Sequence, residues 1–166
     1  MELNPKTTQN YGTRRDCIIK MTVNFIKLNS GAKPPFRATE DSAGSDLFAC
    51  LENVEEEVIE SGERRLIPTG LALEIPRGYG GFVFPRSSLS SKYGISLSNC
   101  VGVIDADYRG EVSIALINHS DMRYTVKNGE RIAQLVLLPV EMPVFIECEQ
   151  LSETERGSGG FGSTGN

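Results

Sequence analysis

Residues 99–118 read NCVGVIDADYRGEVSIALIN, and this stretch decides the fold class. Apolar side chains fill both flanks, whereas the centre, DADYRG, is rich in residues that favour turns. The stretch therefore predicts a β-hairpin: two strands joined by a turn, with Asp105 at its tip and Tyr108 three residues later.

The same pattern continues outward from this stretch in both directions. Short β-branched or alternating runs, with turn residues roughly every 8 to 12 positions, follow one another from residue 22 onward. This spacing is typical of an all-β sandwich or barrel. RSSLSSKYG is the one expected helix, with Ser87 or Ser88 as its N-cap and Gly94 at its end. The expected strands lie in TVNFIKL, EVIESG, RRLIPTG, LALEIPRG, YGGFVFP, EVSIALIN, RYTVKNG, RIAQLVLLP and VFIECE.

Bulk composition bounds the domain count and excludes several classes of protein. The 166 residues, 39% of them hydrophobic, suffice for one domain with a core. A net charge of -5 argues against a broad basic surface for polymeric nucleic acid, and the longest apolar run, IAQLVLLPV, is too short to span a membrane. Four widely separated cysteines favour free thiols and a reducing, cytoplasmic compartment. Residues 1–21 contain no secretory signal; we expect a disordered leader there, and organelle targeting stays open.

The expected hairpin is the first candidate for chemistry. Asp105 follows the apolar run 101–104, and a carboxylate beside apolar walls can act as a general base on water. The alternative is an ordinary turn whose acidic residues serve only the turn. A calcium loop that begins at Asp105 is a poor alternative, because its third ligand, at loop position five, would be Arg109 and its residue at position twelve would be Leu116.

Three further segments carry candidate residues. Arg86, Ser87 and Ser88 open the expected helix, where backbone N–H groups, hydroxyls and a guanidinium suit a phosphate, although plain helix capping is equally consistent. Gln134 lies within an apolar strand, and periodicity leaves open which face it occupies. Asp46 lies just inside a strand after Gly44, which alone is a weak indication.

The carboxyl end, ERGSGGFGSTGN at residues 155–166, has almost no capacity to hold itself in a core. Ordering such residues costs about 1 to 2 kcal/mol each, whereas Phe161 can return about 1 to 3 kcal/mol by stacking on a base. Arg156 and the glycine-rich backbone suit phosphates. A disordered tail or a cloning scar is the alternative.

Five segments, in this order and spacing, resemble the trimeric dUTP pyrophosphatases (dUTPases): AGSDL, PRSSLSSKYGI, GVIDADYRG, GERIAQL and RGSGGFGSTG. The resemblance covers about residues 24–165. It implies a jelly-roll-like all-β fold and a homotrimer whose active sites draw on all three chains. The expected layout is then a leader over residues 1–21, a β domain over 22–150, and a flexible arm over 151–166 that closes over a neighbour's active site.

The resemblance also implies the activity and the roles of individual residues. The reaction is hydrolysis of dUTP to dUMP and pyrophosphate, which limits uracil in DNA and supplies dUMP for thymidylate synthesis. Asp105 would activate the water that attacks the α-phosphorus, and Gln134 would help to hold the α-phosphate and that water. Mg²⁺ is the implied cofactor, with Asp46 contacting it through water. The implied substrate-binding residues are Arg86, Ser87, Ser88, Asn99, Gly102, Val103, Ile104, Tyr108, Arg156, Phe161, Gly162, Ser163 and Thr164.

One position departs from the family pattern, and two other readings stay open. Ser88 stands where the family usually has glycine, which costs about 1 kcal/mol or more only if that position needs a positive φ; we expect an ordinary helix start instead. Within the superfamily, a dCTP deaminase or a bifunctional relative is the alternative. Outside it, a nonenzymatic β-sandwich module that kept the fold is the other.

Overall fold

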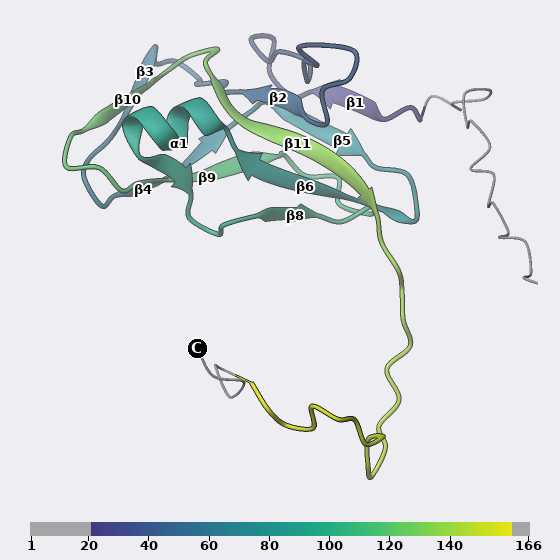
Figure 1. Ribbon diagram of the computed structural model, residues 1–166. Helices are drawn as coiled ribbons and strands as arrows, with labels where there is room; N and C mark the ends of the chain where they lie inside the picture. The colour runs from purple at the N-terminus through teal and green to yellow at the C-terminus, as the bar shows by residue number, and fades with distance from the viewer. Residues whose placement is uncertain (1–20, 161–166) are drawn as a thin grey trace, which may run out of the picture.

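The computed structural model describes residues 21–160 of the chain. Within this range lie eleven strands and one helix, and every strand pairing is antiparallel (Figure 1). The elements are β1 (Asn24–Lys27), β2 (Ser45–Phe48), β3 (Glu56–Ile59), β4 (Arg64–Pro68), β5 (Leu71–Glu74), β6 (Tyr79–Pro85), α1 (Ser87–Tyr93), β7 (Ile95–Leu97), β8 (Gly102–Ile104), β9 (Ser113–Asn118), β10 (Tyr124–Lys127) and β11 (Arg131–Pro139).

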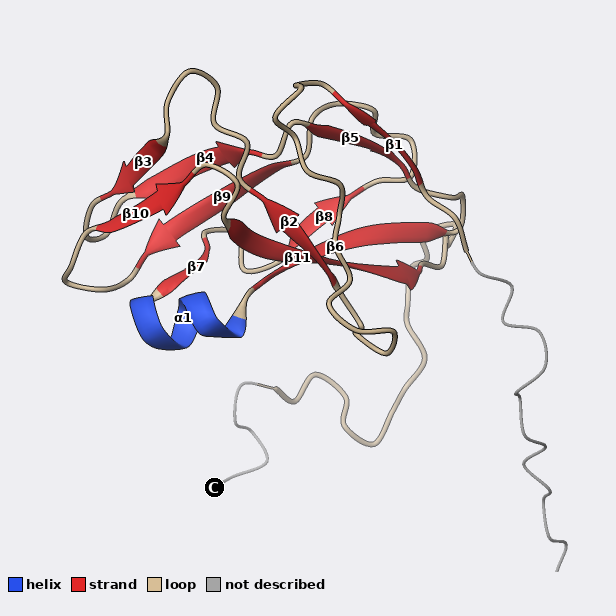
Figure 2. Cartoon of the chain, turned by 90° about the horizontal axis from the view of Figure 1, so that it is seen from above, coloured by secondary structure: helices blue, strands red, loops and turns tan. Residues whose placement is uncertain are grey.

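The strands form four sheets around one core. Figure 2 shows the arrangement of the strands from above. Their orders are β1-β5, β10-β3, β2-β11-β6-β8 and β4-β9-β7. Each sheet contributes side chains to a single hydrophobic cluster. In β9 buried and half-buried positions alternate, as expected for a strand with one face on the core. The all-β class predicted from the sequence is therefore confirmed. The fully buried members of the core include Leu47, Ile59, Ile67, Leu71, Ile95, Ile114, Leu116, Val126 and Ile132.

The hairpin predicted for residues 99–118 is wrong in its pairing. β8 pairs with β6 in the four-stranded sheet, whereas β9 pairs with β4 and β7 in another sheet. Residues 105–112, here called the Asp105 loop, connect the two sheets. Sequence patterns fix which residues are extended, but the pairing partner depends on which strand the core brings alongside.

The strand predicted in VFIECE is also wrong. After β11 ends at Pro139, residues 140–160 contain no strand and lead away from the sheets (Figure 1). Phe145 is 92% exposed and Ile146 is 83% exposed. The local pattern is that of a strand, yet no strand of the described chain pairs with it. The predicted boundary between domain and arm at residue 150 stays a prediction.

Other features of the fold bear on the remaining sequence predictions. The three cysteines in the described part of the chain, Cys50, Cys100 and Cys148, are free thiols, as expected. Burial raises the pKa of the Cys50 thiol, which keeps it protonated and unreactive. Within residues 21–160, the seven-residue α1 is the single helix, and it is too short to cross a bilayer.

Candidate active site

The Asp105 loop and the end of β8 form one wall of a hollow of about 380 Å³. Apolar and small side chains of β4, β6, β7 and β9 also line it. Apart from Phe161, which lies outside the described residues, the residues predicted to recognise uracil and sugar line this hollow together with the predicted base: Asn99, Gly102, Val103, Ile104, Asp105 and Tyr108. The loop also borders a second hollow, of about 800 Å³, which contains none of these residues except Asp105.

The carboxylate of Asp105 is the chemically available group of this hollow. It is exposed, and within the described residues no side-chain hydrogen bond or ion pair engages it. Its backbone carbonyl accepts a hydrogen bond from the Tyr108 amide at 3.1 Å, which closes the turn. An ionised carboxylate with unused lone pairs at the rim of a hollow can take a proton from a water molecule.

The Asp105 loop is held at several points along its length. Arg109 donates from one nitrogen to the carbonyls of Ala106 at 2.7 Å and Tyr108 at 2.9 Å. At the far end the Val112 amide donates to the Leu71 carbonyl at 2.8 Å. Sequence reasoning missed Arg109, although an arginine directly after a turn is well placed to donate to the turn's carbonyls. These contacts fix the backbone that carries Asp105.

A separate hollow, of about 340 Å³, collects the residues predicted to bind phosphate. Asp46 and Gln134 come from the paired strands β2 and β11, and the Asp46 and Gln134 backbones lie directly opposite each other. Arg86, Ser87 and Ser88 come from the junction of β6 and α1. The structure therefore brings these five together, and adds Arg131, which sequence reasoning missed.

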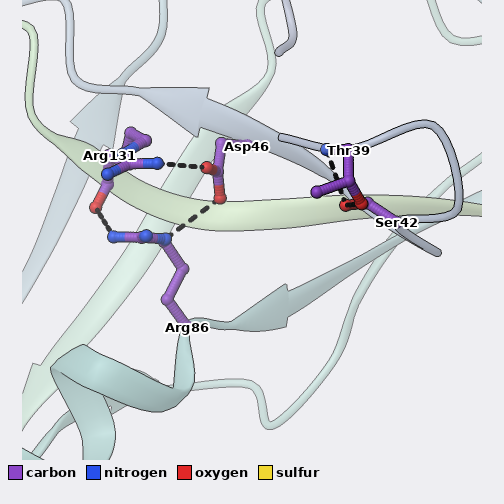
Figure 3. A network of polar contacts seen from close by, with 5 residues as sticks. All are labelled: Thr39, Ser42, Asp46, Arg86 and Arg131. Atoms are coloured by element: carbon purple, nitrogen blue, oxygen red, sulfur yellow. Dashed lines mark hydrogen bonds and ion pairs between the residues drawn. The ribbon is translucent and has the colours of Figure 1, made fainter. Parts of the chain in front are cut away.

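Asp46 binds two arginines at once (Figure 3). Its Oδ1 accepts from Arg86 Nε at 3.0 Å, and its Oδ2 accepts from Arg131 at 3.1 Å. Arg86 also donates to the Arg131 carbonyl at 3.1 Å, so the three residues form a closed network. The Asp46 side chain is only 14% exposed. Hydrogen bonds between ionised groups at such a site hold side chains in fixed positions.

The start of α1 corrects one prediction and confirms another. The N-cap is Arg86, in extended conformation with no side-chain cap, so the expected capping by Ser87 or Ser88 is wrong. Because the Arg86 backbone already leads from β6 into the helix, both serines fall inside its first turn. Ser88 is thus helical and is not among the described non-glycine residues with positive φ. The expected helix start, which carries no backbone cost for serine, is confirmed.

Gln134 lines the hollow that contains Asp46 and Arg86, here called the phosphate hollow, and does not face the core. Its Nε2 donates to the Pro85 carbonyl at 3.0 Å, which ties β11 to the end of β6. A Cβ atom on Gly44 would lie 2.8 Å from Gln134 Oε1, so the Gln134 side chain packs closely against the Gly44 backbone and would have to shift to admit a side chain there. The question that periodicity left open is answered by these contacts.

The two hollows share no lining residue within one chain. The arm adds a third element: Arg156 is exposed and donates from Nε to the Gly159 carbonyl at 2.8 Å, within its own turn. Phe161, Gly162, Ser163 and Thr164 lie outside the described residues. The structure thus presents a carboxylate hollow, a charged phosphate hollow and a projecting arm as separate parts of one chain.

Comparison with known proteins matches this arrangement to one family. The family model for dUTPase matches residues 31–165, which is most of the chain. The chain belongs to the dUTPase family. Among curated relatives, the deoxyuridine 5'-triphosphate nucleotidohydrolase of Desulfitobacterium hafniense (strain DSM 10664 / DCB-2) is 51% identical over 148 residues, which cover 89% of this chain and 97% of the relative. That of Nautilia profundicola is 50% identical over 145 residues, with 87% and 99% covered.

Solved dUTPase structures share the fold. The Staphylococcus bacteriophage 80alpha dUTPase with dUPNHPP is 32% identical, with a TM-score of 0.78 over 87% of this chain and 99% of that chain. A mutant dUTPase of S. aureus phage phi11, solved to show the coordination of a structural Mg(II) ion, is 29% identical, with a TM-score of 0.69 over 78% and 98%. The family, the fold type and the enzyme class predicted from the sequence, a dUTP diphosphatase, are thereby confirmed.

Proposed function

We propose that this dUTPase hydrolyses dUTP to dUMP and pyrophosphate, with Asp105 as the general base. The observation that carries the proposal is the unengaged Asp105 carboxylate at the rim of the hollow formed by β8 and its loop. Asp105 takes a proton from a water molecule, and the water oxygen bonds to the α-phosphorus. The bond between that phosphorus and the oxygen bridging to the β-phosphorus breaks, and pyrophosphate leaves.

The hollow beside Asp105 selects the nucleoside. The backbone of Gly102, Val103 and Ile104 lines it and pairs with the uracil edge, and Asn99 adds a side-chain amide. A thymine methyl group would collide with that backbone. The Tyr108 ring packs beside deoxyribose and leaves no space for a ribose hydroxyl. Selection by shape requires that the residues around the ligand keep their positions. The hydrogen bonds within the Asp105 loop restrict its movement in this way.

The phosphate hollow receives the triphosphate. Arg86, Ser87 and Ser88 contact phosphate oxygens, and Gln134 holds the α-phosphate and the attacking water. Arg156 of the arm reaches the terminal phosphate. Phe161 stacks on uracil while Gly162, Ser163 and Thr164 line the phosphates; this part of the proposal concerns residues outside the described range.

Three copies of the chain complete each site. Support comes from the separation of the two hollows within one chain and from the exposed apolar side chains of residues 140–151, which follow β11. A substrate that needs both hollows and an arm is therefore bound where chains meet. This is the assembly that the family resemblance implies.

Magnesium fits this site only as an ion held largely by the substrate. Among residues 21–160, no three acidic, histidine or cysteine side chains gather into a cage. Both oxygens of Asp46 are already bonded to arginines, so its contact with the ion is through water. When bound, Mg²⁺ supplies positive charge that offsets the charge of the phosphates.

A steady-state assay with four nucleotides tests the proposed function. With Mg²⁺ present, pyrophosphate should appear from dUTP, while dTTP and UTP stay intact and dCTP yields no ammonia. Equal turnover of UTP would contradict the assigned selectivity, and ammonia from dCTP would favour the deaminase alternative. No turnover of any nucleotide would favour the nonenzymatic module.

A further inference from the structure

The ring of Tyr108 lies directly against the backbone of Gly110. A Cβ atom built on Gly110 would lie 2.6 Å from Tyr108 Cζ and 3.0 Å from Cε2, with the hydroxyl oxygen closer still. All three of the nearest atoms belong to this one ring. Real Cβ atoms do not approach other heavy atoms so closely, and the ring therefore occupies the space that any other residue's side chain would need.

A positive φ does not explain the glycine at this position. Six described glycines have positive φ, the conformation that favours glycine, and Gly110 is not one of them. An alanine here avoids the cost of a positive φ, and the three atoms nearest to its Cβ would all belong to the Tyr108 side chain. Gly110 is thus adapted to the ring and not to the turn.

Tyr108 is held at its two ends as well as on this face. Its amide donates to the Asp105 carbonyl at 3.1 Å, and its hydroxyl donates to the Glu111 carbonyl at 3.0 Å. The hydroxyl is consequently occupied within the chain, so the ring meets a ligand through its position. Tyr108 lines the hollow together with Asn99 and Gly102.

We propose that Gly110 is a positioning residue for sugar selectivity: by lacking a side chain, it lets the hydroxyl end of the Tyr108 ring lie against the loop, and this position of the ring closes the hollow beside the sugar. This inference rests on the proposed function, in which Tyr108 excludes a ribose hydroxyl. A methyl group at residue 110 pushes the ring off the loop. The fit to deoxyribose is then lost, while UTP, already excluded, loses little.

The test is the ratio of kcat/KM for dUTP to kcat/KM for UTP, measured on the full-length assembled enzyme. Gly110→Ala should lower this ratio at least tenfold. Gly110→Ala placed on a Tyr108→Ala background should change the ratio less than twofold, because the clashing ring is gone. Gly31→Ala is the matched control: it also has an unstrained φ, and its nearest atom is a flexible side-chain oxygen at 3.3 Å. It should keep the wild-type ratio.

The outcomes separate this inference from the proposed function. A wild-type enzyme that prefers dUTP, together with an unchanged ratio in folded Gly110→Ala, would overturn the inference alone. An effect of equal size with and without the Tyr108 ring would also overturn it, since glycine would then act through another contact. If the wild type does not hydrolyse dUTP at all, the proposed function fails first. Should Gly110→Ala unfold, Tyr108→Phe supplies the same ratio, because it removes the hydroxyl that holds the ring to the Glu111 carbonyl; wild-type selectivity in Tyr108→Phe would overturn the inference.

Discussion

The hollow beside Asp105 and the phosphate hollow are nearly equal in volume, about 380 and 340 Å³, so size does not distinguish their roles. Their chemistry does. The first is lined by β8, its loop and several apolar side chains. It contains two carboxylates: that of Glu111 accepts a hydrogen bond from the Gly70 amide, whereas that of Asp105 is unengaged. In the second, Asp46 binds Arg86 and Arg131 in a closed network. Shape selection needs a stiff, mostly neutral wall, whereas phosphate binding needs cations that are positioned before the substrate arrives.

Replacing Asp105 by asparagine should remove the general base from the hollow beside Asp105 without changing the shape of that hollow. The amide has nearly the same size but cannot accept a proton from water, so kcat should fall by roughly a thousandfold. Binding of the non-hydrolysable analogue dUPNHPP, measured by calorimetry, should change by less than about threefold. Wild-type turnover in Asp105→Asn would reject its role as the base.

Removing residues 156–166 tests whether the arm contributes to the binding and hydrolysis of dUTP. The loss of one charge-assisted contact and one stacked ring should lower kcat/KM for dUTP by roughly a hundredfold. Thermal stability should stay within about 1 °C, because the last described residues are exposed or half-buried and Arg156 bonds only within its own turn. A truncated enzyme with full activity would show that the arm is dispensable.

Asp46→Asn tests the network that positions the phosphate hollow. Asparagine retains one acceptor oxygen, but its amide nitrogen is a donor that faces a guanidinium, so one arginine is released. We expect KM for dUTP to rise by about tenfold, which corresponds to about 1.4 kcal/mol, with a smaller change in kcat. Asp41→Asn, an exposed residue of the preceding loop, is the matched control and should match the wild type. Equal KM values for the wild type, Asp46→Asn and Asp41→Asn would show that Arg86 and Arg131 do not need Asp46 to hold them in position.

The sequence predicted some features of the hollow beside Asp105 and not others. Motif spacing identified Asp105, Tyr108 and their neighbours, and the structure places them around one hollow. It failed on the partner of β8, because a three-residue strand contains too little pattern to choose between β6 and β9. The contact between Tyr108 and Gly110 was also invisible, since it depends on the path of the Asp105 loop.

The phosphate hollow shows the same limit for long-range contacts. Alternation could not tell which way Gln134 faces, because the answer depends on the Pro85 carbonyl and the approach of Gly44. Asp46 and Arg131 are 85 residues apart in the chain, and only the pairing of β2 with β11 brings them together. Local sequence therefore identified residue types well, whereas partners across sheets required the fold.

The smallest expected effect concerns Tyr124, whose hydroxyl donates to Glu130, the residue before Arg131. Tyr124→Phe removes this bond and should lower the free energy of unfolding by about 1 kcal/mol, with kcat/KM for dUTP unchanged. Burial, and then the bond to Glu130, raise the pKa of Tyr124 above its ordinary value of about 10. The resulting stabilisation is complete below pH 10 and is lost as the pH rises through the folded-state pKa.

The difference in Tm between wild type and Tyr124→Phe should therefore shrink from pH 8 to pH 11, measured by differential scanning calorimetry. Tyr93→Phe is the control: it keeps the ring beside Tyr124 and leaves the bond to Glu130 intact, so its Tm should follow the wild-type pH dependence. A Tm difference that is independent of pH would mean that Tyr124 stabilises this end of β11 by packing alone. A fall in kcat/KM for dUTP would instead show that the bond between Tyr124 and Glu130 helps to position the neighbouring Arg131. The phosphate hollow would then depend on residues outside its own lining.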